Sequence, residues 1–183
     1  MRASLNPQGV FASDCVMMLY ETELSSPATS VTISGLDLDT TNNVTLNFYA
    51  VNDANADTSY TVAINNDTTS ANYSDAYMAA YGANLTTSGK NSPGSCYLSQ
   101  AAALAQECWA TLTIATKSGT SCRPTTHLSA RKIIGSGTAP EIMMRCSEWD
   151  NSADNITSLV IVATQANGLG VGTCIRLYGV VAK

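Results

Sequence analysis

The chain has 183 residues, enough for one domain that buries a sizeable core without the help of metals or disulfides. Its net charge is −5, and charged residues make up only 13% of it, against about 25% in average soluble domains. Arg131-Lys132 is the only adjacent basic pair, so a nucleic-acid partner bound through its phosphates is not expected. No apolar stretch approaches the roughly 18 to 20 residues that span a bilayer, so no membrane partner is expected either.

Residues 1–14 are predicted to form an N-terminal arm, and residues 15–183 a single domain. The first strand-like run begins near residue 15 and leaves only the segment MRASLNPQGVFASD before it. Polar residues and a proline interrupt any apolar leader in this segment, so we expect synthesis in a cytoplasm without a cleaved signal peptide. We expect the arm to be extended until it docks against a partner.

Alternation of apolar and polar residues with a period of two dominates the chain and predicts β-strands, with turns in the Gly-, Asn-, Asp- and Ser-rich segments between them. Only residues 97–107, YLSQAAALAQE, have the composition of a short helix. The fold is therefore predicted as all-β, a single-domain jelly-roll or β-sandwich of about 8 to 10 antiparallel strands with at most one short helix. The runs that predict strands are residues 15–20, 29–36, 44–52, 59–65, 108–116, 126–134, 141–147, 155–164 and 173–182.

The same alternation predicts which side chains face the core. In the run at 108–116, Trp109, Leu112 and Ile114 are expected to share the inner face, which requires a slip in phase and so predicts a β-bulge. The runs at 44–52 and 59–65 alternate without a slip. Their predicted core-facing residues are Val44, Leu46, Phe48, Ala50, Tyr60, Val62 and Ile64.

Three alternating glycines, Gly168, Gly170 and Gly172, raise the question of a phosphate-binding loop. A dinucleotide fingerprint needs a helix directly after the glycines and an acidic residue about 20 positions further on. The alternating segment TCIRLYGVVA follows instead, and it predicts a strand. We therefore expect a hairpin turn that returns the last strand to its sheet.

The segment DANAD offers oxygen ligands at Asp53, Asn55 and Asp57, as a calcium loop does. An EF-hand also needs glycine at its sixth position and glutamate at its twelfth, where this chain has Thr58 and Ile64. An EF-hand is thus excluded. The remaining interpretations are a polar turn capped by its own side chains, which we prefer, and a looser calcium site.

No catalytic site, metal or cofactor is predicted, and we do not expect an enzyme. His127 is the only histidine, and no serine stands in a G-x-S-x-G context for it to activate. A lone histidine on a strand is usually packed or hydrogen-bonded, and we expect this here. A pair of carboxylates that meet in space is the alternative, because such pairs hydrolyse glycosides. The candidates for such a pair are Asp37, Asp39, Glu141 and Glu148.

Six cysteines have none of the spacings of zinc or C-x-x-C redox sites. Free thiols are the default after cytoplasmic synthesis, although the even number leaves late disulfides open. Cys15, Cys146 and Cys174 lie within strand-like runs and are expected to pack as small hydrophobic residues. The positions of all six are 15, 96, 108, 122, 146 and 174.

Two surface features have an ordinary and a functional interpretation. Five N-x-[ST] sequons are expected to reflect an Asn/Thr-rich composition rather than glycan sites. Eight tyrosines and two tryptophans are expected in the core and at interfaces, although aromatic planes also stack on sugars. The sequons begin at Asn43, Asn66, Asn72, Asn84 and Asn155.

Three segments, in order and spacing, resemble the jelly-roll domains of tailed-bacteriophage virion proteins across residues 44–183. They are SYTVAINNDTTSANYSDAYM, EWDNSADNITSLVIVA and GVGTCIRLYGVVAK. The sequence departs from the family pattern where Asn66 replaces a usual glycine and Thr173 a frequent serine. The residues that carry the resemblance are Asn65, Asp67, Asn72, Tyr73, Ser74, Trp149, Ile156, Gly172, Arg176, Leu177, Tyr178 and Gly179.

The resemblance implies a non-enzymatic structural protein of a phage virion, made in the host cytoplasm. Within that group the compact chain fits a capsid decoration (cement) subunit that sits on the capsid surface and binds the major capsid protein. Such a subunit is expected to form a homotrimer and to stabilise the assembled shell. The alternative is a head- or tail-fibre module that recognises a host surface glycan.

Overall fold

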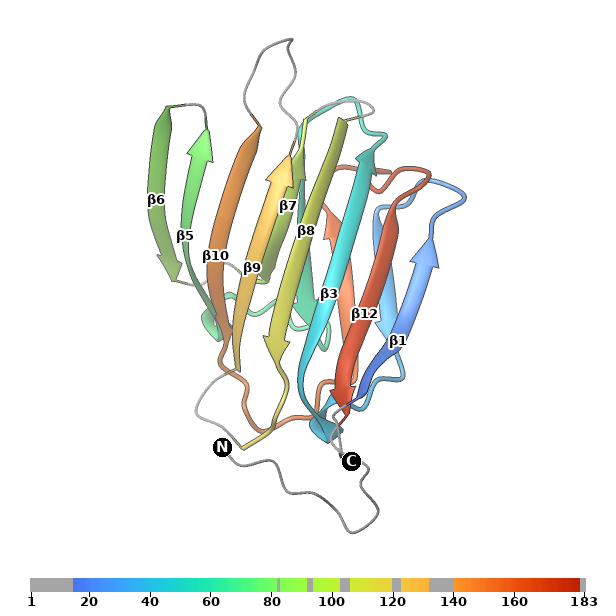
Figure 1. The fold of residues 1–183 in the computed structure, drawn as a ribbon, viewed down its shortest axis with the longest axis vertical. Helices are drawn as coiled ribbons and strands as arrows, with labels where there is room; N and C mark the ends of the chain where they lie inside the picture. The colour runs from blue at the N-terminus through green and yellow to red at the C-terminus, as the bar shows by residue number, and fades with distance from the viewer. Residues whose placement is uncertain are drawn as a thin grey trace, which may run out of the picture.

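A computed structural model gives the fold (Figure 1) and describes residues 15–81, 83–91, 94–102, 106–119, 123–131 and 140–181. Within these residues the chain forms twelve β-strands and two short 3₁₀ turns. All strand pairs are antiparallel, and the strands form an eight-stranded and a four-stranded sheet. The predicted all-β sandwich is confirmed, with more strands than expected. The predicted arm at residues 1–14 lies outside the described residues.

The large sheet has the order β1-β12-β3-β8-β9-β10-β5-β6, and the small sheet the order β2-β11-β4-β7. The strands of the large sheet are β1 (Cys15–Glu23), β3 (Thr41–Asn52), β5 (Tyr73–Tyr81), β6 (Asn84–Asn91), β8 (Gln106–Ala115), β9 (Arg123–Arg131), β10 (Glu141–Trp149) and β12 (Cys174–Val181). The remaining elements are β2 (Ser30–Ser34), β4 (Thr58–Ile64), β7 (Cys96–Ala101), β11 (Ser158–Ala163), η1 (Leu38–Thr40) and η2 (Ser70–Asn72).

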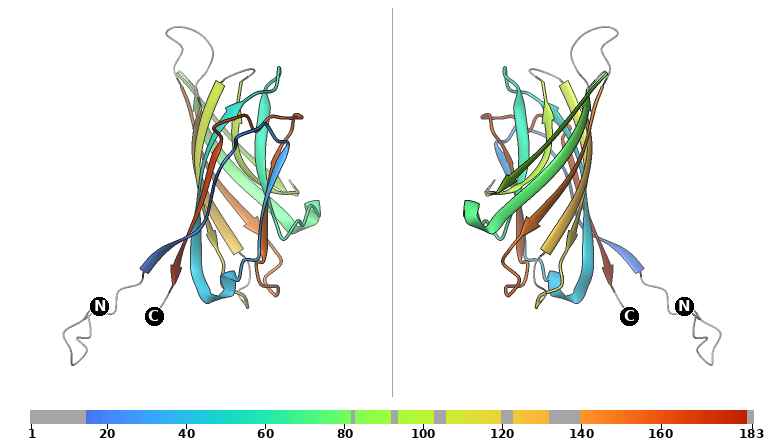
Figure 2. Two further views of the ribbon diagram at one scale, coloured as in Figure 1. Left: turned by 90° about the vertical axis from the view of Figure 1, so that its right-hand side faces the viewer. Right: turned by 90° about the vertical axis from the view of Figure 1, so that its left-hand side faces the viewer.

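The two sheets pack face to face, as the edge-on views in Figure 2 show, and the core lies between them. The alternation predicted for β3 and β4 is confirmed, because every residue assigned to the core there has no exposed surface. Outward positions of β3, such as Thr45 and Asn47, are polar and partly exposed. This half of the sandwich therefore has the usual polarity, with apolar residues inside and polar residues outside.

The predicted helix at residues 97–107 is wrong. Residues 96–101 form β7, which pairs with β4, and residue 106 begins β8. Leu98 and Ala101 are fully buried in the core cluster. Helix propensity is a weak preference, and here the burial of one strand face between the sheets overrides it.

The predicted bulge in β8 is also wrong. β8 pairs with β3 in unbroken register from Gln106 to Ala115. Cys108 and Ala110, not Trp109, occupy the inner face with Leu112 and Ile114, and the Trp109 side chain is 43% exposed. The sequence predicts Trp109 in the core because it is the largest apolar residue of the run. The alternation of side chains along β8 places Cys108 and Ala110 there instead.

The glycine-rich segment joins the two sheets and is not the hairpin turn we predicted. β11 belongs to the small sheet and β12 to the large one, so the segment between them is a crossover. As predicted, a strand and not a helix follows the glycines. Gly170 lies so close to β3 that its N–H donates to the Val51 carbonyl at 2.8 Å, and an added Cβ would lie 2.7 Å from Asp53 Cγ. Backbone approach, and not phosphate binding, explains that glycine.

The cysteines are not distributed as predicted. Cys146 is exposed and Cys174 only half-buried, whereas Cys96 and Cys108 are buried; all four are free thiols. Burial raises the pKa of both buried thiols to about 12, so they stay protonated and act as small apolar groups. The side chain of Cys15 and the whole of Cys122 lie outside the described residues. Among described residues, no helix has the length and hydropathy needed to cross a membrane.

Candidate functional site

In strands β9, β10 and β5 the outward positions are apolar and the inward positions mostly polar, the reverse of the arrangement in β3. We call these three strands the reversed strands. Their outward positions include Leu128, Ile142, Met144 and Met78, which are between 42% and 59% exposed. Most of their inward positions carry charged, hydroxyl or aromatic side chains instead, with Met143 and Ala79 as apolar exceptions. On β9 the inward residues are Arg123, Thr125, His127, Ser129 and Arg131, and on β10 and β5 they include Glu141, Arg145, Asp75 and Tyr77.

A groove lies on the inner face of this reversed part. The small sheet ends at the edge strand β7, which packs over β8 and β9, while the large sheet continues past it through β10, β5 and β6 (Figure 1). Two cavities of about 710 and 440 Å³ occupy the uncovered face. They share Ser59, Tyr77, Tyr97 and Arg145 as lining residues, so they form one continuous groove. Its size is that of a small-molecule site.

Arg145 lies at the centre of the groove. Its guanidinium group lies over the rings of Tyr97 and Tyr77, at 4.1 and 4.7 Å from their centroids. It also forms an ion pair with Asp75, whose side chain is 2% exposed. The antiparallel register explains this placement, because Arg145 is opposite Tyr77 on β5, and Asp75 is the next inward residue of that strand. Cation–π contacts hold the guanidinium in a fixed position.

A second ion pair lies nearer the other end of the groove. Glu141 begins β10 directly opposite Arg131 of β9, and the Glu141 carboxylate accepts hydrogen bonds from the Arg131 guanidinium at 2.6 Å. Burial raises the pKa of Tyr97 to about 12, so its phenol stays neutral and can both donate and accept hydrogen bonds. The groove thus combines two internally neutralised ion pairs with tyrosine rings.

His127 is packed and hydrogen-bonded, as predicted. Its Nε2 bonds to the Leu98 carbonyl, and its ring meets Tyr97 edge to face at 6.2 Å between centroids. Burial lowers the pKa of His127 to about 4, because desolvation and the nearby Arg145 charge outweigh the Leu98 hydrogen bond. Nδ1 has no hydrogen-bond partner, so no carboxylate orients this ring as a general base.

The four candidate carboxylates lie at separate places, two at η1 and two on β10. Asp37 and Asp39 flank and occupy η1, where Asp37 accepts from Asn155 and Asp39 lies 3.9 Å from Arg123. Glu141 and Glu148 stand near opposite ends of β10, about 24 Å apart at the rise of a strand. Glu141 pairs with Arg131, while Glu148 accepts a hydrogen bond from Ser74. Glu141 and Glu148 therefore do not form a glycosidase-type pair.

The DANAD segment is the turn between β3 and β4, organised by Asn52. The Asn52 side chain accepts hydrogen bonds from Ala54 N–H and the Thr58 hydroxyl, and donates to the Ala56 and Ala102 carbonyls. In the ranges that the structure describes, no group of three or more His, Cys, Asp or Glu side chains is arranged to hold a metal ion.

Three of the residues singled out in the sequence, Asp67, Asn72 and Trp149, form a structural latch. The Asp67 carboxylate accepts hydrogen bonds from Trp149 Nε1 at 2.9 Å, Asn72 Nδ2 at 2.8 Å and Thr69 N–H at 2.9 Å. Partial burial by itself raises the pKa of Asp67, but these hydrogen bonds outweigh it and lower the pKa to about 2. The latch joins the segment after β4 to the end of β10, so these residues position the scaffold and not a ligand.

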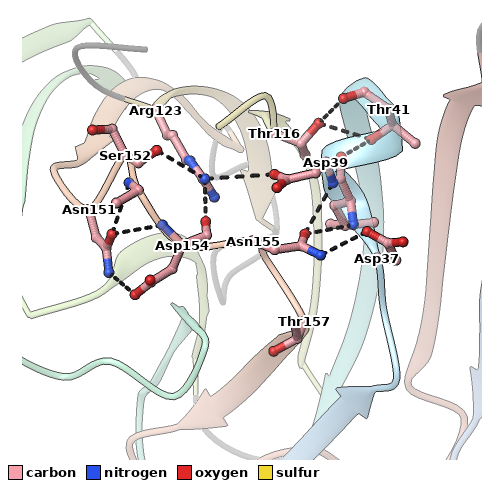
Figure 3. A network of polar contacts seen from close by, with 12 residues as sticks. Asp37, Asp39, Thr41, Thr116, Arg123, Asn151, Ser152, Asp154, Asn155 and Thr157 are labelled. Carbon is pink, nitrogen blue, oxygen red and sulfur yellow. Dashed lines mark hydrogen bonds and ion pairs between the residues drawn. The ribbon is translucent and has the colours of Figure 1, made fainter. Parts of the chain in front are cut away.

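A second polar network surrounds the loop between β10 and β11 (Figure 3). The fully buried Arg123 guanidinium donates to the backbone carbonyls of Ser152 and Asp154 and lies 5.3 Å from the Trp149 ring. The Asn155 side chain accepts from the backbone N–H groups of Leu38 and Asp39. Two sequon asparagines, Asn155 and Asn72, thus use their side-chain amides in hydrogen bonds within the protein.

Fifteen positions on the outer face of the sheet, over the reversed strands and their neighbours β6 and β8, form a largely apolar surface, and we call it the outer patch. Cross-strand registers align fifteen outward positions in three rows over β6, β5, β10, β9 and β8. None of the fifteen is charged. The rows are Leu85-Ala80-Ile142-Ala130-Trp109, Thr87-Met78-Met144-Leu128-Thr111 and Gly89-Ala76-Cys146-Thr126-Thr113.

Sequence reasoning missed both the groove and the outer patch. The signal was present in THLSAR and EIMMRC, where charged residues alternate with Leu, Ile and Met just as they do in any strand. Alternation alone does not say which face is inside. The register to neighbouring strands decides it, and here it turns the charged face inward.

Neither a family model nor a curated protein sequence matches the chain. Among solved structures, a galectin, LEC-6 of Caenorhabditis elegans, shares 12% identity at a TM-score of 0.32, over 87% of this chain and 94% of that one. A bifunctional GH43-CE protein of Bacteroides eggerthii shares 6% identity at 0.33, over 78% of this chain but 18% of that one. A heptameric SAP-like pentraxin of Limulus polyphemus shares 8% identity at 0.24, over 86% of this chain and 68% of that one. At these TM-scores the likenesses carry no argument about function.

Proposed function

We propose that this protein is a non-enzymatic virion component, a capsid decoration (cement) subunit that binds the assembled capsid of a tailed phage through its outer patch. Each outward position of a sheet covers about 33 Å², so fifteen positions cover about 500 Å². Patches of this size on monomers commonly mark interaction sites. A specific interface buries about 800 Å² on each partner, so the outer patch supplies its apolar centre, with polar residues around it as the rim.

The outer patch is the observation that carries this proposal. Strands β9 and β10 expose Leu128, Ile142 and Met144, and these apolar side chains contribute no burial to an isolated domain. Docking on a shell removes this apolar surface from water without stripping water from charges. Because the subunit binds assembled capsid and not dispersed subunits, it shifts the equilibrium towards the shell by mass action.

The test uses phage heads that lack the protein. Wild-type protein is expected to co-sediment with these heads and to raise the temperature at which they release DNA. Met144→Glu places a charge at the centre of the outer patch and is expected to weaken co-sedimentation at least about tenfold. Thr32→Glu is the matched control, since Thr32 is an exposed strand residue of the small sheet.

Equal binding by the Met144→Glu variant would refute the assignment of the outer patch. Labelling of the protein only on the tail in electron micrographs would refute decoration itself. The expected homotrimer is measured separately, by light scattering of the purified protein.

A second candidate function is recognition of a host surface glycan by a fibre module, and the groove favours it. Clefts in which a few polar groups converge beside aromatic rings are typical ligand sites. This function predicts that the purified protein adsorbs to host cells and blocks infection. A glycan array without any bound member would contradict it.

A further inference from the structure

The groove contains two buried polar atoms without a partner in the protein. Asp75 Oδ2 pairs with Arg145 Nη1, but Asp75 Oδ1 and Arg145 Nε have no hydrogen-bond partner. The two side chains are only 2% and 11% exposed, and both line the smaller cavity. Buried donors and acceptors are satisfied in the great majority of cases, since leaving one unsatisfied costs about 1–3 kcal/mol. The side chains that carry these two atoms line the groove, so a water molecule or ligand that enters beside the ion pair is what can supply the missing partners.

The charges of the groove select a neutral ligand. Its charged lining residues are Arg131, Arg145, Asp57, Asp75 and Glu141, and the two arginines each pair with a carboxylate. A phosphate or a sugar acid entering the groove would meet carboxylates and no unneutralised arginine. An ordinary cation would have to compete with the guanidinium groups for Asp75 and Glu141.

The donor and acceptor chemistry of the two unpartnered atoms suits two adjacent hydroxyl groups. A hydroxyl donates one hydrogen bond and accepts two, so one hydroxyl can donate to Asp75 Oδ1 while its neighbour accepts from Arg145 Nε. Bonds to ionised groups are the stronger kind. Tyr77 lies opposite Arg145, and Tyr81 lines the groove further along β5, so both tyrosines supply apolar surface for the C–H groups of a pyranose.

We propose that the groove binds a neutral saccharide through a vicinal diol held by Arg145 and Asp75. Tyr77 and Tyr97 position the guanidinium, and strands β5 and β6 form the floor on which the sugar ring lies. This inference rests on the second candidate function and gives its ligand class. It is independent of the outer patch, which faces away from the groove.

The test is saturation-transfer NMR with lactose, maltotriose and methyl α-mannoside as probes, and sialyllactose and glucose 6-phosphate as anionic controls. At least one neutral probe is expected to bind with a dissociation constant in the range of about 0.1–10 mM. Arg145→Met is expected to weaken this binding at least tenfold. Arg176→Met, which removes an exposed arginine on the outer side, is expected to leave it unchanged.

A second variant covers the case in which Arg145→Met fails to fold. Ser88 is an exposed groove residue on β6, opposite Tyr77. Ser88→Trp fills the groove while Arg145 and Asp75 remain in the protein, and it is expected to abolish binding. Binding of none of the neutral probes, of the anionic probes alone, or of neutral probes equally well by Ser88→Trp would overturn the proposal.

Cell adsorption separates this inference from the function on which it rests. If wild-type protein binds a neutral probe but does not adsorb to host cells, the saccharide site stands and the host-recognition function fails. If the protein adsorbs and Ser88→Trp adsorbs equally, host recognition stands and the groove is not its site.

Discussion

Replacing Asp67 by asparagine tests whether the latch stabilises the fold through its charge. The pKa of this carboxyl falls from 3.8 to about 2 in the folded protein, and each unit corresponds to about 1.4 kcal/mol. The upper limit is thus about 2.5 kcal/mol, and screening at this partly exposed group reduces it to about 1–2 kcal/mol. Asp67→Asn is expected to lower the free energy of unfolding by this amount at pH 7.

The pH dependence distinguishes this cause from a packing effect. A lowered carboxyl pKa contributes stability above the unfolded value of about 3.8, and the contribution is lost as pH falls through the folded value of about 2. Urea unfolding of wild type and Asp67→Asn at pH 7, 5, 3 and 2, followed by tryptophan fluorescence, should show a difference that shrinks towards pH 2. Asp150→Asn, at an exposed aspartate beside Trp149, is the control and should change stability by less than about 0.5 kcal/mol. A difference that is absent at pH 7, or equal at pH 7 and pH 2, would refute the reasoning.

Three further results are expected. Gly170→Ala should destabilise the protein by about 1–3 kcal/mol in urea unfolding, because its Cβ would lie 2.8 Å from the Val51 carbonyl oxygen, whereas Gly89→Ala has ordinary contacts and should not. Asn66→Val should lower the melting temperature, at a cost of about 1–2 kcal/mol, because residue 66 has φ of +56° and a β-branched side chain strains that conformation; an unchanged melting temperature would contradict this. The NMR titration of His127 should have its midpoint near pH 4, with stability falling as pH drops from about 6.5 towards 4, and a midpoint near 6.5 would show that the ring is not desolvated.

The sequence predicted the fold class well, because period-two alternation reports strands directly. β3 and β4 show why: each has one continuous apolar face and packs at the centre of a sheet. The error at residues 97–107 arose because alanine, leucine and glutamine favour helix in isolation, while burial of β7 depends on strands distant in sequence. Trp109 was assigned to the core by size, although its neighbours in the sheet put it outside.

The candidate site was beyond sequence reasoning for a related reason. Arg145, Asp75 and Tyr97 come from three strands, and nothing local connects them. The sequence did identify Asp67 and Trp149, which meet in space, but through a resemblance that predicts fold and not a site. The pairing register between strands must be known before the charged face of an alternating strand can be assigned to the inside of the sandwich.

The place of β12 in the large sheet has a consequence for biosynthesis. This strand lies between β1 and β3, so Cys15 pairs with Val181 across most of the chain length. While the ribosome is still adding residues 174–181, β1 and β3 lack their shared neighbour and present unpaired edges. We therefore expect the nascent chain to complete this sheet only after synthesis of β12, and to fold slowly, as chains with distant pairings do.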